Sequence, residues 1–217
     1  MPDLDTAYLI TALVTMFVVI DPIAIAPIFI AITRGMTVAK RRLIAWRAVM
    51  VAAIILVLFA ALGETLLTFI GISMPAFRVA GGLLLFLTAL DMLFERRTKR
   101  REGQAEEAEE DDADDPSVFP LAIPLIAGPG SIASVILLAG EKPGGEGLIA
   151  VLLITALVLI VMGVTLQLSG YLERVIGKTV INVITRLLGM LLAALSVQFV
   201  LEGLTAFGFG PGAAVPV

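Results

Sequence analysis

A single aspartate, Asp21, lies in a stretch that is otherwise uncharged for a dozen residues on either side. The following Pro22 lacks an N–H and biases Asp21 away from helical dihedral angles, while aspartate is a preferred N-cap residue. We therefore expect one helix to end at Asp21 and a new helix to begin at Pro22. A buried carboxylate at such a break can bind a cation or an ammonium group, or take up a proton.

A second break is expected at Gly128, Pro129, Gly130 and Ser131. The glycines allow the backbone to unwind and allow a ligand to approach its N–H groups closely. Each new helix presents free N–H groups and the positive end of its dipole, which favour an anionic group. Because Asp21 repels an anion, the two breaks together fit a small zwitterion. Its carboxylate would lie near Gly130 and Ser131, and its ammonium near Asp21.

The other residues near the two breaks are apolar and leave a charged substrate side chain without an obvious partner. They are Ala24, Ile25, Ala26, Ile132 and Ala133. The substrate that fits best is therefore a small neutral amino acid, provided that the two breaks lie side by side in the fold. The predicted substrate-binding residues are Asp21, Pro22, Ala24, Ile25, Pro27, Gly128, Pro129, Gly130, Ser131 and Ser134.

These residues lie in a chain with the composition of an integral membrane protein. Of its 217 residues, 59% are hydrophobic and only 16% are charged, and the mean hydropathy is +1.04. Six apolar stretches are about 20 residues or longer, which is enough to cross the hydrocarbon core as helices. They cover residues 7–33, 48–71, 75–94, 118–139, 148–170 and 184–207. Free backbone groups are costly in hydrocarbon, so the two breaks must be buried in protein or line a wet cavity.

The two halves of the chain resemble each other. The segment DPIAIAPIF at 21–29 aligns with GPGSIASVI at 128–136, and FRVAGGLLL at 77–85 aligns with TRLLGMLLA at 185–193. Because each half has three spans, the second half must cross the membrane in the opposite direction. The expected fold is an all-α polytopic membrane protein, a 3+3 inverted repeat with broken first and fourth helices, as in many secondary transporters. The alternative is that both breaks are proline kinks repaired by neighbouring helices.

The positions of the basic residues predict the orientation in the membrane. Thirteen of the 15 lysines and arginines lie in or beside the connections after the first, third and fifth spans, and the two exceptions are Arg78 and Lys142. By the positive-inside rule these connections face the cytoplasm and both termini lie outside it. Tyr8, Trp46 and Tyr171 lie near span ends and are expected to be interfacial anchors. The segment before the first span is acidic, so we expect no cleavable signal there.

The chain divides into a first three-helix repeat (residues 1–94), a charged linker (95–117) and a second three-helix repeat (118–217), forming one membrane domain. The linker is anionic and has no apolar period, so we expect a disordered cytoplasmic spacer. Much of the acidity of the chain lies there, and no nucleic-acid partner is expected. The expected partners are a small-molecule substrate and membrane lipid, and homo-oligomer formation is left open.

The chain contains no cysteine and no histidine. This excludes disulfides, thiol chemistry, Cys/His metal sites and triads that use histidine. An aspartyl protease would need two facing aspartates, but Asp91 lies too near a span end to pair with Asp21. Gly81 and Gly82 indicate close helix packing, because no Gly-rich phosphate signature with a lysine follows them. We therefore expect no enzyme activity, no metal and no cofactor.

Two pairs of opposite charges flank the turns at the membrane surfaces. Glu64 and Arg78 lie on either side of the outer turn between the second and third spans, and Glu173 and Arg186 lie at the matching cytoplasmic turn. Each pair could form an ion pair that closes its end of a transport pathway. The alternative is that each arginine extends its guanidinium to the lipid headgroups.

Four segments resemble the MarC family of six-span bacterial inner-membrane proteins, also described as neutral amino acid transporters. They are FVVIDPIAIAPIFIAITRGMT, FRVAGGLLLFLTALDML, PLAIPLIAGPGSIASVI and ITRLLGMLLAALSVQFVLEGL. Where family members usually have glycine and asparagine after the first Asp-Pro-Ile, this chain has Ala24 and Ile25. The resemblance implies a bacterial inner-membrane location and transport of small neutral amino acids. A channel and a non-transporting scaffold or stress-associated protein are the alternatives.

Overall fold

The computed structural model describes residues 6–94, 96, 115–142 and 145–209, which form helices and the turns between them, without a strand in these ranges. The side chains of residues 173, 174, 176 and 178 lie outside the description, as does most of the acidic linker, so the predicted linker disorder is not tested. In chain order the elements are α1 (Thr6–Ile20), α2 (Pro22–Ile32), α3 (Val38–Ile70), α4 (Met74–Leu93), η1 (Ser117–Ile126), α6 (Pro129–Ala139), α7 (Gly145–Gln167) and α8 (Ser169–Ala206).

The number of spans agrees with the sequence. Five segments are long and apolar enough to cross a membrane, namely Thr6–Ile32, Val38–Ile70, Met74–Leu93, Gly145–Gln167 and Thr179–Ala206. A sixth span is formed if η1 and α6, which are bent by 55° relative to each other, count as one. The prediction of an all-α polytopic membrane protein is therefore confirmed. The 3+3 inverted repeat stays a prediction.

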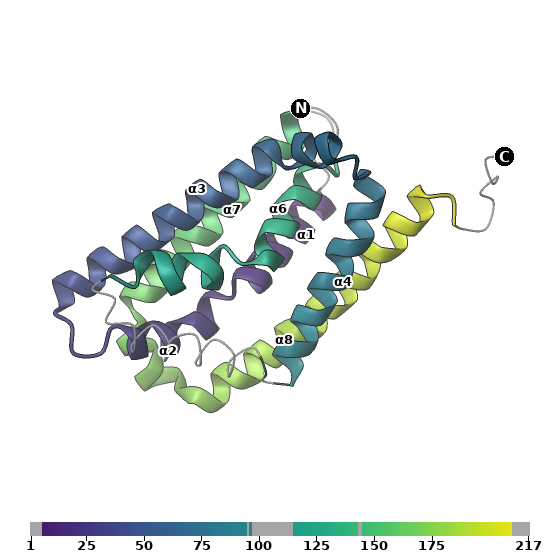
Figure 1. The fold of residues 1–217 in the computed structure, drawn as a ribbon. Helices are drawn as coiled ribbons and strands as arrows, with labels where there is room; N and C mark the ends of the chain where they lie inside the picture. Colours follow the sequence, from purple (N-terminus) through teal and green to yellow (C-terminus); the bar gives the residue numbers. More distant parts are fainter. Residues whose placement is uncertain (1–5, 95, 97–114, 143–144, 210–217) are drawn as a thin grey trace.

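The short segments lie between two pairs of long helices. In Figure 1, α3 and α7 run side by side along one flank, and α4 and α8 pack together along the other. Between them, α3 also contacts η1 and α6, while α7 contacts α1 and α2. On the other flank, α4 contacts α6 and α8 contacts α2. Each half-helix that begins at a break, α2 or α6, is therefore enclosed by long helices of both flanks.

Glycines allow α4 and α8 to approach closely as an antiparallel pair. A Cβ on Gly82 would lie 2.8 Å from the carbonyl oxygen of Ser196, and a Cβ on Gly189 would lie 3.2 Å from that of Ala89. A Cβ on Gly203 would lie 3.0 Å from the carbonyl oxygen of Pro75. Residues later in α8 therefore contact residues earlier in α4, as in any antiparallel pair of helices. Close packing at Gly82, predicted from the sequence, is confirmed.

Two helices extend well beyond the apolar stretches in the sequence. Helix α3 begins at Val38, ten residues before the predicted start of the span, because Thr37 caps it by accepting a hydrogen bond from Lys40 N at 3.3 Å. Its 33 residues measure about 50 Å, against about 30 Å for a hydrocarbon core. Helix α8 begins at Ser169 and changes direction at Gly177, where φ is 71°. Hydropathy detects only the apolar part of such helices.

Of the five spans that are not bent pairs, the broken first span is the most enclosed. In the most apolar 18 residues of Thr6–Ile32, 67% are buried inside the protein. The corresponding share is 28% for both Met74–Leu93 and Thr179–Ala206. Lipid therefore covers much of α4 and α8, while other helices surround α1 and α2. This enclosure allows a polar break in the first span to avoid contact with hydrocarbon.

Candidate functional site

The first break lies at Asp21, as the sequence predicts. The residue has φ 57° and ψ 65°, and it is the one non-glycine residue with positive φ in the described part of the chain. A side chain in this region costs about 1–2 kcal/mol, although aspartate tolerates it better than most residues. The Asp21 carboxylate caps α2 by accepting a hydrogen bond from Ala24 N at 3.3 Å. The residue is completely buried.

The second break lies before Pro129, which begins α6, and it also agrees with the sequence. Gly128 is extended, with φ −87° and ψ 172°, and provides no side-chain cap. The Ser131 hydroxyl donates to the carbonyl oxygens of Ile126 at 2.8 Å and Gly128 at 2.9 Å. The hydroxyl of Ser134 donates to Gly130 O at 2.9 Å. The hydroxyl protons are therefore used within the break, and the donors that α6 can offer to an anion are the N–H groups of its first turn.

The two breaks lie against each other. A Cβ on Gly130 would lie 3.2 Å from Cγ1 of Val19, two residues before Asp21. It would also lie 3.6 Å from the Thr88 hydroxyl and 3.7 Å from Leu85 Cδ2, both on α4. The first turn of α6 thus packs on the last turn of α1, which is the arrangement that a ligand held by both breaks requires.

The remaining predicted substrate-binding residues lie in or next to these first turns. Pro22, Ala24 and Ile25 are buried in α2, and Pro27 is partly buried within the same helix. On the other side of the site, Pro129 is exposed. The first break is therefore sealed inside the protein, whereas the second reaches the surface at its proline.

The predicted outer ion pair is not formed. Glu64 and Lys142 line a cleft of about 950 Å³ between α3, α6 and the start of α7, on the side of the molecule that is predicted to be the outer one. Arg78 lies near the carboxylate of Glu141 instead, and its charge opposes the rise in the pKa of Glu141 that burial causes. Among the residues that the structure describes, no ion pair joins Glu64 to Arg78. The side chain of Glu173 lies outside the description, so its pairing with Arg186 remains a prediction.

Tyr8 lies at the end of the enclosed helices at which α1 begins. It is not the interfacial anchor that its position suggests, because it is 4% exposed. Its hydroxyl donates to Leu138 O, at the end of α6, at 2.9 Å, and lies 3.4 Å from Gly147 O. The Lys142 ammonium lies 5.9 Å from the centre of its ring. These partners of Tyr8 could not be predicted from the sequence, because the contacts join residues that are far apart in the chain.

Arg41 has a similar position at the other end of the molecule. Its guanidinium carbon lies 5.6 Å from the centre of the Phe29 ring in α2. The same guanidinium donates to the hydroxyl of Ser169, at the start of α8, at 3.4 Å. Arg41 therefore joins α3, α2 and α8. In the sequence it is one of several neighbouring basic residues, and only the fold distinguishes it.

Buried hydroxyl groups were also missed by the sequence analysis. Thr33 and Thr88 donate to carbonyl oxygens one turn earlier in their helices. Thr15 of α1 and Thr155 of α7 are buried as deeply as Thr33 and more deeply than Thr88, but their hydroxyls have no hydrogen-bond partner among the described residues. Both lie about two turns beyond the contact between Tyr8 and Gly147. They are thus at about the same level along two helices that pack together.

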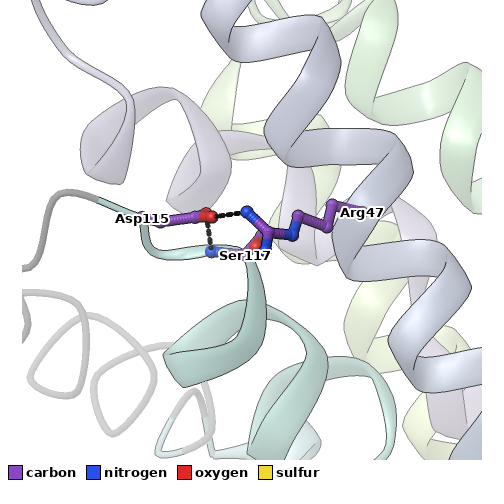
Figure 2. Close-up of polar contacts among 3 residues, drawn as sticks. All are labelled: Arg47, Asp115 and Ser117. Atoms are coloured by element: carbon purple, nitrogen blue, oxygen red, sulfur yellow. Dashed lines mark hydrogen bonds and ion pairs between the residues drawn. The ribbon is translucent and has the colours of Figure 1, made fainter.

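The segment that leads into η1 is fixed to α3 (Figure 2). Arg47 forms an ion pair with Asp115, whose other carboxylate oxygen accepts a hydrogen bond from Ser117 N at 3.1 Å. The nearby polar groups of Ser117, together with the Arg47 guanidinium, hold the pKa of Asp115 below its ordinary value. This contact sets where the second half of the chain enters the membrane domain.

Comparison with known proteins agrees with the resemblance in sequence. A family model described as "MarC family integral membrane protein" matches residues 6–207. A UPF0056 membrane protein of Aquifex aeolicus is 39% identical over 196 residues, which cover 90% of this chain and 91% of the relative. No solved structure matches.

Relatives are also present in well-studied bacteria. The UPF0056 membrane protein YhcE of Escherichia coli is 34% identical, with 91% of each chain covered. The UPF0056 membrane protein YvbG of Bacillus subtilis is 34% identical, with 91% of this chain and 94% of the relative covered. With a family model that spans nearly its whole length and relatives above 30% identity, this chain belongs to the MarC family of integral membrane proteins.

Proposed function

We propose that this chain is a secondary transporter of small neutral amino acids, with its substrate site at the two helix breaks. The observation that carries the proposal is Asp21, a completely buried carboxylate at a helix break against which the first turn of a second half-helix packs. Structural kinks alone do not require a carboxylate in this position. Ionisable residues inside membrane domains generally mark a pathway for a substrate or an ion.

The two breaks offer complementary groups to a zwitterion. Asp21 can hold an ammonium group, while the first turn of α6 offers backbone N–H groups and the positive end of a helix dipole to a carboxylate. This turn has no acidic residue, and its neighbours Val19 and Leu85 are apolar. A ligand with both charges therefore fits better than a simple amine or a simple acid.

The space beside the second break favours a small substrate. Gly130 is buried, and a single added carbon on it would already lie 3.2 Å from Val19. Thr88 is the polar side chain nearest to that position. Glycine, alanine and serine need little room, whereas a large or charged side chain would have to displace Val19 or Leu85.

The helix contacts support the inverted repeat that this proposal uses. Under the repeat, α1 corresponds to η1, α2 to α6, α3 to α7, and α4 to α8. Exchanging each element for its counterpart converts the contacts of α3 with η1 and α6 into those of α7 with α1 and α2. It also converts the contact of α4 with α6 into that of α8 with α2. Substrate sites in such folds lie at the repeat interface near the middle of the membrane.

The experiment is transport by purified protein in liposomes. Liposomes loaded with unlabelled alanine should exchange it for labelled alanine outside, and exchange that exceeds net uptake indicates a carrier. A flux that does not depend on alanine inside would indicate a channel. Failure to transport or bind any neutral amino acid would refute the proposal and favour a scaffold.

Asp21→Asn tests the site itself. Asparagine is also a good N-cap, so the variant should fold and insert as the wild type does. We expect it to lose most of its exchange activity, because the amide cannot balance an ammonium charge or take up a proton. The matched control is Asp91→Asn on α4, which should retain exchange. Equal activity of the Asp21 variant and the wild type across a pH series would show that Asp21 acts only as a helix cap.

A further inference from the structure

Glu141 is the second residue after the end of α6, and this end of α6 lies beside the start of α4 (Figure 1). It follows the last turn of α6, and its N–H donates to Leu138 O at 3.3 Å. The preceding Gly140 packs on Met74 of α4, with 2.8 Å between an added Cβ and the Met74 methyl group. Tyr8 of α1 bonds to the same carbonyl of Leu138. The position of Glu141 is thus linked to the packing of the end of α6.

One oxygen of this carboxylate is shielded and unsatisfied. Oε2 of Glu141 is buried and has no hydrogen-bond partner among the described residues. No ion pair involves Glu141 in this part of the chain. A shielded oxygen without a donor destabilises the ionised form much more than the neutral form.

The charged groups around Glu141 come from each neighbouring element. Glu202 on α8 adds a like charge, while Arg78 on α4 and Lys142 in the same connection add opposite charges. Burial, followed by the charge of Glu202, raises the pKa of Glu141, and Arg78 and Lys142 oppose the rise. The remaining titratable groups nearby are the phenol of Tyr8 on α1, which interacts with the charge of Glu141, Glu64, which lines the outer cleft with Lys142, and the exposed Glu146 on α7.

We propose that Glu141 is a proton-binding site, and that the bound proton holds the outer end of α6 in its packed position. When the proton leaves, the carboxylate gains a charge that its surroundings leave partly unsatisfied. Hydration of that charge requires the end of α6 to separate from α1 and α4. Because α6 is a short helix, such a movement also reaches its first turn at Gly130. This inference does not depend on which substrate the protein carries.

The test uses the absence of cysteine from this chain. Val135→Cys places a thiol at a fully buried position in α6. Its reaction rate with a neutral maleimide is measured in detergent over a pH series that runs from mildly acidic to mildly alkaline conditions, so that it extends above the ordinary range of a carboxyl pKa. Dividing each rate by that of the unfolded protein at the same pH removes the effect of thiol ionisation. We expect the normalised rate to rise with pH.

Glu141→Gln in this background should abolish the rise and keep the rate at its acidic value. Glu146→Gln, which neutralises an exposed glutamate nearby, is the matched control and should leave the rise unchanged. An undiminished rise in Glu141→Gln would overturn the proposal. A rate that is high at every pH in that variant would also overturn it, since a neutral side chain would then not hold α6.

Two further variants test the sign of the effect and do not require Glu141→Gln to fold. Glu202→Gln removes the like charge, so the midpoint of the rise should move to lower pH. Arg78→Gln removes an opposite charge, so the midpoint should move to higher pH. Shifts in the same direction, or no shift in either variant, would show that the thiol reports a different group.

Discussion

Gly82 offers a strong test of the packing between α4 and α8. In Gly82→Ala, the new methyl group would lie 2.8 Å from the carbonyl oxygen of Ser196 and 2.8 Å from Cγ2 of Val200. The adjacent Gly81 faces α6 instead, where a new methyl group would lie 2.8 Å from Cδ1 of Leu137. The two substitutions are chemically identical and occupy neighbouring positions. They differ in whether the methyl group meets backbone or the end of a flexible side chain.

The expected magnitudes follow from this difference. Each substitution gains up to about 1 kcal/mol because alanine favours the helix over glycine. Overpacking typically costs about 1–3 kcal/mol, and at Gly82 the backbone of α8 can relieve the contact only by moving as a whole. Gly82→Ala should therefore lower the free energy of unfolding by about 1–2 kcal/mol. Gly81→Ala should lie within about 1 kcal/mol of wild type, since Leu137 can rotate.

The measurement is loss of helical circular dichroism as the SDS fraction of mixed micelles is raised. Gly170→Ala provides a second control, because a Cβ at Gly170 meets nothing within 4 Å. It should be neutral or slightly stabilising. If Gly82→Ala is as stable as Gly81→Ala, then α4 and α8 are not in backbone contact at Ser196, and the antiparallel register described above is wrong.

Two further predictions concern polar groups. Thr15→Val and Thr155→Val should each raise the free energy of unfolding by about 1 kcal/mol, whereas Thr33→Val, which loses a 2.7 Å hydrogen bond to a carbonyl, should lower it by a similar amount. Destabilisation by Thr15→Val would mean that its hydroxyl binds a partner such as water. Because the pKa of Asp115 is lowered in the folded state, its stabilising contribution is present at neutral pH and is lost as the pH falls through the folded-state pKa. Asp115→Asn should therefore lower the free energy of unfolding at neutral pH by at most about 1 kcal/mol, because the ion pair is exposed. In acid the variant and the wild type should be equally stable, and a difference that persists there would contradict this reasoning.

The helix breaks could be predicted from the sequence because local chemistry determines them. Proline removes a backbone donor and restricts the residue before it, and these effects hold in any fold. Asp21 and Pro129 therefore end and begin helices where expected. The positive φ of Asp21 could not be predicted in the same way. The sequence indicates only that Asp21 leaves helical dihedral angles, and its left-handed conformation depends on how α1 and α2 pack.

Contacts between distant parts of the chain could not be predicted. Tyr8 was expected to be an interfacial anchor because it is aromatic and near a span end, but it donates a hydrogen bond to Leu138, 130 residues away. Arg41 is one of several basic residues after the first span, and its position over Phe29 depends on how α3 meets α2. The long starts of α3 and α8 were missed because hydropathy falls where a helix leaves the apolar core.

These two residues explain how the proposed transporter could open one end at a time. Tyr8 comes from the first half of the chain and holds the last turn of α6, which belongs to the second half. Arg41 also comes from the first half, and it joins Phe29 of α2 to Ser169 of the second half. The end of α6 and the end of α2 are therefore each held by a contact between the halves, and these contacts share no residue. Loss of the Tyr8 contact would free the end of α6 while Arg41 still holds α2, and loss of the Arg41 contact would do the reverse. A substrate held between the two breaks could then be exposed to either side in turn, which alternating access requires.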